Sequence, residues 1–153
     1  MEKWLTDLTV EELKAKILVK PYKPFTIDGL PVFMNIEKEL LPNEVFKNHP
    51  ELPIEASNMG RIRCNGEILL QKPDPEKSKS DPYGYLWVEI PNVSKYKLVY
   101  RLVAETWNER PNPEIYTTVH HISNNGMDNR PENLLWVSSD QHKEIHPKLK
   151  NLG

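Results

Sequence analysis

The chain has 153 residues, of which 38% are apolar, enough for one compact domain or a catalytic module with a small appendage. Its single cysteine excludes an intramolecular disulfide and a cysteine-based zinc ribbon, so we expect a reducing, cytoplasmic setting. The net charge of −2 argues mildly against nucleic-acid binding, but all five arginines lie after residue 56, where the balance is +1. No apolar run approaches the roughly 18–20 residues of a membrane span, and we expect neither a membrane partner nor a signal peptide.

Residues 1–53 predict one helix followed by irregular structure. Thr9 and Glu12 have the spacing of a capping box, an apolar stripe follows, and Pro21 ends the helix. Further prolines interrupt the rest of the segment, where we expect one or two short strands and a helical turn near Glu37 to Leu41. We assign no function to this N-terminal part and expect the remaining residues, 54–153, to form one compact unit.

An antiparallel β platform is predicted between residues 54 and 100. Ile54 to Arg63 has the pattern of two strands around a tight turn at Asn58–Gly60, and Asn65-Gly66 predicts a hairpin. A charged, proline-rich loop is predicted at 71–83. Strands are predicted at 85–90 and from residue 96, and a helix is predicted at 101–107.

Four of the five histidines lie within one stretch of 27 residues near the C-terminus. His120 and His121 end a predicted strand, and a loop dense in turn residues and a returning strand at 134–137 follow. A capping box then opens a short predicted helix that carries His142 and His146, four residues apart, on one face. The order is therefore strand, loop, strand and helix, with histidines on the first strand and on the helix.

This arrangement can divide phosphodiester hydrolysis between neighbouring groups. Adjacent strand residues point to opposite sides, so His120 and His121 are expected to have different roles. One imidazole binds a divalent metal together with His142, and the other deprotonates a water, which suits an unperturbed pKa of about 6.5. The metal stabilises the charge that develops on the scissile phosphate. Asn133 either bridges the loop backbone or holds the base in a productive orientation.

The stretch from His120 to His146 resembles the ββα-metal motif of HNH endonucleases. The intervals between His121, Asn133 and His142, of twelve and nine residues, are similar to those of phage and intron homing endonucleases. The resemblance implies an α+β fold in which a short antiparallel β platform precedes a C-terminal ββα-metal (His-Me finger) motif with its core at 117–146. It also implies a metal-dependent endonuclease that nicks or cleaves double-stranded DNA.

Two upstream segments extend the resemblance to about residues 54–146. Residues 99–107 are similar to the helix-forming segment that precedes the motif, where a histidine often takes the place of Tyr100. The segment Ser-Asn-Met-Gly-Arg-Ile-Arg at 57–63 resembles the "SN-x-GR-[IV]-[RK]" element of NUMOD4-type modules, which accompany these nucleases. We therefore expect the elements at 54–70 and 85–100 to support DNA contacts.

The resemblance assigns a role to each matching position. It implies that His121 is the general base, that Asn133 is the central, mainly structural Asn of the catalytic motif, and that His142 is a metal ligand. His120 departs from the pattern because many family members carry a metal-binding Asp there, and it is similar instead to the histidine ligands of colicin-type toxin DNases. His146 would then be a third ligand. Imidazoles favour Zn²⁺, Ni²⁺, Mn²⁺ or Co²⁺, so we expect one divalent transition metal, with Mg²⁺ or Mn²⁺ as activators.

Three arginines are candidates for DNA contacts. Arg130 lies in the loop that should border the site, which favours a phosphate contact. Arg61 and Arg63 alternate on a predicted strand, where a solvated strand face is an equal alternative to phosphate binding. A single site makes one nick, so a double-strand break requires a homodimer or sequential nicking.

Other functions remain open at this point. The motif could serve as a scaffold in a catalytically inactive DNA-binding or regulatory module. It could also be a structural metal site in which His120, His142 and His146 hold the C-terminus in place. A toxin-like effector nuclease is a further alternative, and it would require a tightly binding immunity partner.

Overall fold

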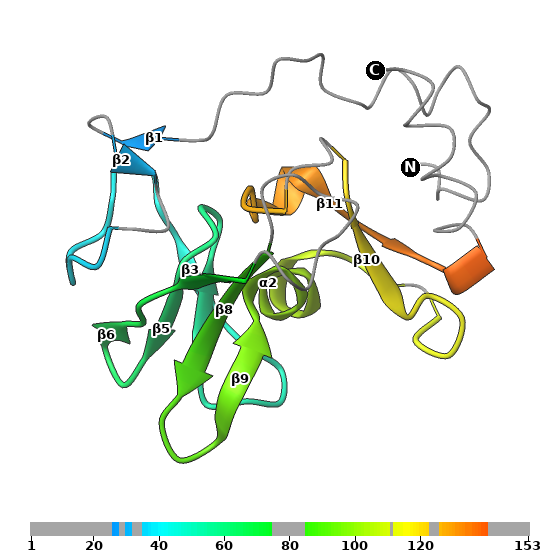
Figure 1. The fold of residues 1–153 in the computed structure, drawn as a ribbon, viewed down its shortest axis with the longest axis horizontal. Coiled ribbons are helices and arrows are strands. Elements are labelled where there is room, and N and C mark those ends of the chain that lie inside the picture. Colours follow the sequence, from blue (N-terminus) through cyan, green and yellow to red (C-terminus); the bar gives the residue numbers. More distant parts are fainter. Residues whose placement is uncertain are drawn as a thin grey trace.

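The structure, a computed structural model, describes residues 26–27, 30–31, 35–74, 85–110, 112–122 and 126–140 (Figure 1). The elements in chain order are β1 Thr26–Ile27, β2 Leu30–Pro31, β3 Phe46–Asn48, β4 Glu55–Ser57, β5 Ile62–Cys64, β6 Glu67–Ile68, β7 Lys72–Asp74, β8 Tyr85–Ile90, β9 Ser94–Leu98, α2 Val99–Trp107, β10 Thr118–His121, the 3-10 helix η4 Pro131–Asn133, and β11 Leu134–Val137. The predicted helix before Pro21 lies outside the described residues. No helix in the described ranges is long and apolar enough to cross a bilayer.

All strand pairs of the described residues are antiparallel. The sheets have the orders β1-β2, β3-β4-β5-β6, β7-β8-β9 and β10-β11. Helix α2 lies between the two larger sheets on one side and the β10–β11 hairpin on the other (Figure 1). This arrangement of short antiparallel strands and a central helix confirms the predicted α+β class.

The turns of the β platform follow from local sequence. Asn65 and Gly66 both have positive φ, 53° and 78°, which is the conformation that a tight two-residue hairpin requires. The hairpin pairs Cys64 with Glu67 and places Arg63 opposite Ile68. The predicted hairpin is confirmed, as are the strands on either side of the Asn58–Gly60 turn.

The structure differs from the expectations in three places. Strand β3 pairs with β4, so the expected division after residue 53 crosses a hydrogen-bonded strand pair. Strand β7 lies inside the predicted proline-rich loop, and its Pro73 is tolerated because β7 is an edge strand, where a missing N–H disrupts no ladder. The predicted helical turn near Glu37 to Leu41 is wrong, since these residues contain no helix.

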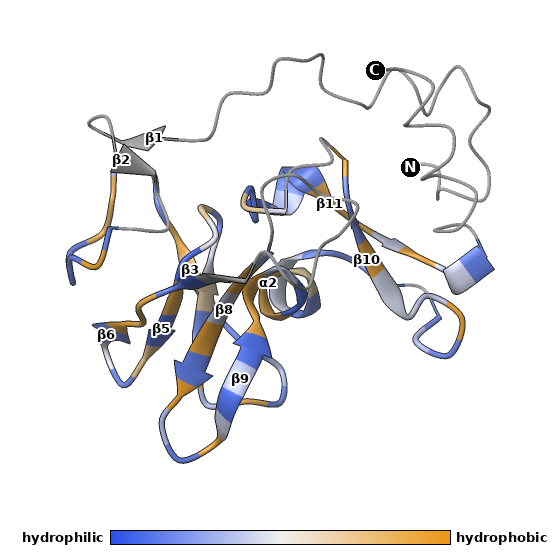
Figure 2. Ribbon diagram, viewed as in Figure 1, coloured by the Kyte–Doolittle hydropathy of each residue, from blue (hydrophilic) through white to orange (hydrophobic). Residues whose placement is uncertain are grey.

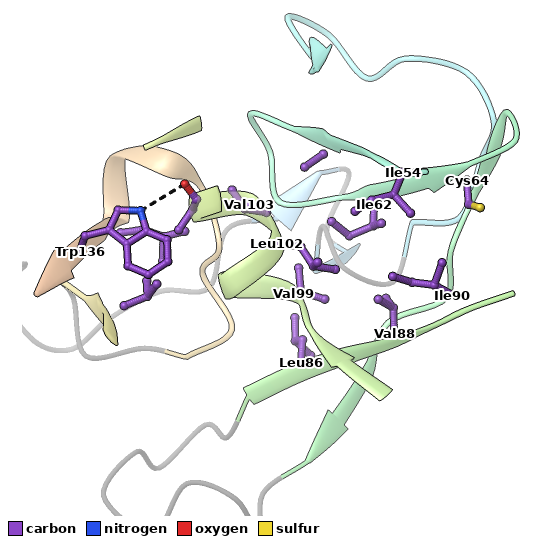
Figure 3. Packing of buried hydrophobic residues seen from close by; sticks show 14 residues of the cluster. Ile54, Ile62, Cys64, Leu86, Val88, Ile90, Val99, Leu102, Val103 and Trp136 are labelled. Carbon is purple, nitrogen blue, oxygen red and sulfur yellow. Dashed lines mark hydrogen bonds between the residues drawn. The ribbon is translucent and has the colours of Figure 1, made fainter. Parts of the chain in front are cut away.

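The core lies on both faces of α2. Val99, Leu102 and Val103 are at most 2% exposed and pack against side chains from β4, β5 and β8, as Figure 3 shows. Figure 2 shows apolar residues along β8 and along the neighbouring helix α2. On the side of the β10–β11 hairpin, Trp136 is buried and its indole N–H donates to the carbonyl of Ala104 at 3.4 Å (Figure 3).

Residues of β5 and β11 also belong to the core. Cys64 is a buried free thiol within the cluster, and Leu134 and Trp136 are core residues. Trp107, at the end of α2, donates from its indole N–H to the carbonyl of Ala56 at 2.8 Å, which ties the helix to β4. The platform and the histidine-bearing hairpin are thus held on one common helix.

Candidate active site

The β10–β11 hairpin places both described histidines of the motif. His120 is opposite Leu135 and His121 is opposite Leu134, and the pairing continues when Ile122 donates its backbone N–H to the carbonyl of Asn133 at 2.8 Å. His120 and His121 are 3% and 5% exposed. The sequence therefore positions two buried imidazoles at the end of a short strand, next to the loop that leads to Asn133.

Two tyrosines and one amide surround His121. The ring of Tyr85, from β8, is stacked on the imidazole with centroids 5.7 Å apart, and the ring of Tyr100, from α2, meets it edge-on at 5.0 Å. The Oδ1 of Asn129 lies 2.8 Å from the His121 Nε2. Burial raises the pKa of the Tyr100 phenol, which stays protonated at neutral pH. His121 thus lies between two aromatic rings and is hydrogen-bonded to Asn129.

Asn133 ties the loop together from inside. Its Nδ2 donates to the carbonyl of Asp128 at 2.8 Å, and its backbone N–H donates to the carbonyl of Arg130 at 2.9 Å. Asn108, the C-cap residue of α2, donates through its Nδ2 to the carbonyls of Pro131 and Leu134, both at 2.9 Å. Of the two roles expected for Asn133, this geometry fits the bridging of the loop backbone.

Arg130 is held by a carboxylate of the same loop. Its Nε and Nη2 donate to the two carboxylate oxygens of Asp128 at 2.8 and 2.6 Å, and Nη1 lies 3.8 Å from Glu132. The Asp128 side chain is 1% exposed, whereas that of Arg130 is 27% exposed. Arg130 therefore keeps a solvent-facing edge beside the loop while its other edge holds Asp128.

Arg61 lies on neither a solvated strand face nor a DNA-facing surface. Its side chain is 1% exposed, and its guanidinium donates to both carboxylate oxygens of the buried Glu44. The remaining donors reach the backbone carbonyls of Asn35, Glu37 and Glu39 at 3.0–3.2 Å. Both expectations for Arg61 are therefore corrected, because burial and these five bonds leave no donor for a phosphate. Because the carbonyls of residues 35, 37 and 39 accept from Arg61, this segment is held in a non-helical conformation.

Arg63 is paired at the surface. Its Nε and Nη2 donate to the Glu55 carboxylate at 3.0 and 2.7 Å, and its guanidinium lies 4.1 Å from the ring centroid of Phe46. The hydrogen bond from Arg63 lowers the pKa of Glu55. The Arg63 side chain is 23% exposed, so it stays a candidate for a DNA contact. A phosphate would bind to Arg63 while its guanidinium remains paired with Glu55.

The metal-ligand prediction depends partly on residues beyond the described ranges. His142 and His146 both lie outside them. Helical conformation begins at Ser139, directly after β11, as the predicted strand–loop–strand–helix order requires. Within the described ranges, no group of three or more His, Cys, Asp or Glu side chains is arranged to hold a metal ion. Of the predicted metal ligands, the described hairpin carries His120, whose imidazole can bind a metal through nitrogen.

Sequence reasoning missed Asn129 and Tyr85. Asn129 belongs to the loop that is dense in turn residues, any one of which could fix the loop beside the metal, and Tyr85 begins a predicted strand, so neither was named as a contact of His121. Both contact His121 through the fold, from the loop after β10 and from β8 respectively. Because neither contact follows from sequence spacing, no local signal in one sequence could have found them.

Known proteins were then compared with the chain. No family model matches the sequence. Two proteins of Acanthamoeba polyphaga mimivirus, both named uncharacterized HNH endonucleases (L245 and L247), are 38% and 31% identical to it over 102 and 103 residues. About two thirds of the chain is thus similar in sequence to proteins named HNH endonucleases. The aligned regions are 65% of this chain but only 30% and 25% of the two relatives, so the chain matches less than a third of their length.

A solved structure shows the same fold. The HNH homing endonuclease I-HmuI, described as binding and cleaving DNA, superposes with a TM-score of 0.55 at 23% identity and covers 71% of this chain and 61% of its own. The predicted α+β fold of an HNH homing endonuclease is thereby confirmed. The resemblance of residues 57–63 to a NUMOD4-type element stays a prediction.

Proposed function

We propose that the protein is a metal-dependent endonuclease that hydrolyses phosphodiester bonds of double-stranded DNA. The observation that carries the proposal is the setting of His121: a buried imidazole at the end of β10, walled by Tyr85 and Tyr100 and hydrogen-bonded by Asn129. The relatives named HNH endonucleases and the DNA-cleaving structural neighbour support the same conclusion.

His121 acts as the general base in this proposal. A neutral imidazole has an ordinary pKa of about 6.5, so near neutral pH it can take a proton from the attacking water. The rings of Tyr85 and Tyr100 restrict the orientation of the imidazole, so its lone pair keeps one direction. Asn133 contributes indirectly by tying the loop that carries Asn129.

His120 would hold the divalent metal, together with His142 and with His146 as a third ligand. The donor set fits such an ion because neutral imidazoles are common ligands of transition metals. When bound, the metal supplies a positive charge that stabilises the developing negative charge on the scissile phosphate. His120 itself is 3% exposed, so burial restricts its imidazole to few orientations.

DNA is the proposed partner. Arg130 has the best claim to a phosphate, because its partly exposed guanidinium belongs to the loop that holds Asn129 and Asn133. Arg63 is a second candidate at the surface of the four-stranded sheet. With one site per chain, the expected product is a nick, and a double-strand break requires two chains or two successive events.

A plasmid assay tests the proposal. The purified full chain is incubated with supercoiled plasmid in Mn²⁺, Ni²⁺, Zn²⁺ or Mg²⁺, or in EDTA, and an electrophoretic shift measures DNA binding in parallel. We expect nicked plasmid with at least one transition metal and none in EDTA. If the protein binds DNA but does not nick it in any of these metals, the proposed enzyme activity is overturned. That result would support a catalytically inactive DNA-binding module instead.

A further inference from the structure

The turn from Ser57 to Arg61 is closed by its own groups. The Ser57 Oγ accepts hydrogen bonds from the backbone N–H groups of Met59 and Arg61 at 3.1 and 3.0 Å. The Gly60 N–H donates to the Ser57 carbonyl at 3.1 Å. Serine at the first position therefore fixes the backbone path of the turn, which we call the Gly60 turn.

The Gly60 turn is also fastened to the segment that precedes β3. Asn58 accepts the backbone N–H of Val45 at its Oδ1, at 2.8 Å, and donates from Nδ2 to the carbonyl of Asn43 at 3.1 Å. Arg61 forms the buried ion pair with Glu44. The side chains of Asn58 and Arg61 thus bind within the protein, which leaves them unsuited to reading DNA.

Gly60 touches the loop of the candidate active site. Its φ is +79°, and a Cβ built on it would lie 3.2 Å from the carbonyl carbon, the carbonyl oxygen and the Cβ of Asn129. From the other side, the Nε2 of Gln71 donates to the Gly60 carbonyl at 2.7 Å. A side chain at position 60 would require the Asn129 backbone to shift by a few tenths of an ångström and would be strained at this positive φ, so glycine suits this approach.

Asn129, which Gly60 contacts, is in turn hydrogen-bonded to His121. With the amide oriented so that Oδ1 lies 2.8 Å from the His121 Nε2, this oxygen can only accept, which places the proton on the His121 Nε2. A neutral His121 then carries its lone pair on Nδ1. Asn129 is 3% exposed, and within the part of the chain that the structure describes its Nδ2 has no hydrogen-bond partner. Such a buried, unsatisfied donor is uncommon in a loop with a purely structural role.

We propose that Asn129 is a positioning residue that holds His121 as the Nε2–H tautomer, and that the Gly60 turn is a brace that seats Asn129. The role of Asn129 in cleavage rests on the proposed function, whereas the tautomer and the brace do not. The motif at 57–63 accordingly supports the loop that carries Asn129 instead of contacting DNA. This also gives a physical reason for a glycine followed by a buried arginine in that motif.

Nuclear magnetic resonance of the full chain reports the tautomer directly. The ¹⁵N shifts of His121 are measured near pH 8, above the ordinary imidazole pKa of about 6.5. The wild type should show the Nε2–H form as the dominant tautomer. Asn129→Leu removes the acceptor at similar volume and should give a mixture of tautomers, whereas Asn129→Asp keeps an oxygen acceptor and should retain the Nε2–H form.

Nicking kinetics supply the second readout. Asn129→Leu should lower kcat by about 10–100-fold, the usual effect of losing a group that orients a catalytic ligand, with little change in KM for DNA. Asn129→Asp should recover most of the lost rate. A fall in kcat without a change of tautomer in Asn129→Leu would overturn the proposed role, since a merely structural loss would then explain the rate.

Two glycine variants test the brace. Gly60→Ala should shift the His121 signals and lower kcat, because the new methyl group meets Asn129 at 3.2 Å. Gly66→Ala is the matched control: Gly66 has nearly the same φ, +78°, but nothing lies within 4 Å of its added Cβ. Equal effects of both variants on the His121 signals would overturn the brace, because backbone strain alone would account for them.

The outcomes separate this inference from the proposed function. A wild-type His121 that is mainly Nδ1–H overturns the positioning role even if the protein nicks DNA. A dominant Nε2–H form that is lost in Asn129→Leu upholds the positioning geometry. If the same wild-type protein fails to nick DNA in every metal tested, the proposed endonuclease is overturned while the positioning geometry stands.

Discussion

At the scale of single residues, charged side chains divide into those that hold the fold and those that border the site. Arg61 and Glu44 form a buried pair inside the protein, whereas Arg63 and Glu55 form a similar pair at its surface. Removing one member of a buried pair leaves an uncompensated charge, but an exposed pair is screened by water. The two arginines, two residues apart, therefore form a matched comparison.

Arg61→Ala should destabilise the protein strongly. Because Glu44 would be left as a buried charge without its partner, we expect the free energy of unfolding to fall by about 3–5 kcal/mol. Arg63→Ala, the control, should cost about 0–1 kcal/mol. Urea denaturation followed by circular dichroism measures both. Similar losses for the two variants would contradict the structural role given to Arg61.

The same carboxylates predict acid sensitivity. Burial of Glu44 raises its pKa, but the hydrogen bonds from Arg61, Leu41 and Ser57 outweigh burial and hold the pKa below its ordinary value. A lowered folded-state pKa contributes stability that is present above the unfolded value and is lost as pH falls through the folded value. The free energy of unfolding should therefore decrease below about pH 4.5, the ordinary value.

Denaturant titrations between neutral and acidic pH check this expectation. Glu44→Gln lowers stability at neutral pH and removes one titrating group, so its stability should depend less steeply on pH in the acidic range. An unchanged slope in Glu44→Gln would show that other carboxylates cause the acid sensitivity.

At the scale of elements, α2 connects the β platform to the histidine-bearing hairpin. Leu102 is 2% exposed in the core on the platform side, and Trp107 bonds to β4. Leu102→Ala should cost about 2–5 kcal/mol of unfolding free energy through lost burial and the cavity that remains. Val93, 43% exposed in the β8–β9 turn region, is the control, and Val93→Ala should change stability by less than about 0.5 kcal/mol. A small effect of Leu102→Ala would contradict the central place of α2.

Local sequence signals predicted the elements well where the signal was itself local. Asn65-Gly66 predicted a hairpin because its backbone conformation needs these residues. The strand at 85–90 and the order strand, loop, strand around His121 and Asn133 were likewise predicted. Strand β7 was missed because proline normally disfavours a strand, and only its place at a sheet edge makes Pro73 acceptable.

Long-range contacts could not be predicted from the one sequence. Arg61 and Arg63 lie close together in sequence, and nothing in the local pattern distinguishes them. Arg61 is buried because it pairs with Glu44, which is 17 residues away. Asn129 could be placed in a turn, but its contact with Gly60 depends on how the sheet meets the loop. The sequence therefore indicated the chemistry at His121 without the groups that position it.

At the scale of the whole molecule, the platform, α2 and the hairpin converge on His121. Tyr85 comes from β8, Tyr100 from α2 and Asn129 from the loop after β10, so three separate elements define the orientation of one imidazole. An imidazole held in this way needs an intact platform. This explains why a small nuclease unit would include the upstream sheets rather than the ββα-metal motif alone.

The most direct test of the endonuclease is the rate of plasmid nicking by the full chain and by His121→Gln in the same metal. We expect metal-dependent nicking by the wild type and a rate lowered by about 10²–10⁴-fold in His121→Gln, the usual contribution of a general base. Circular dichroism should show the same folded fraction for both proteins. Equal nicking rates, or no nicking by the wild type in any metal, would contradict the account.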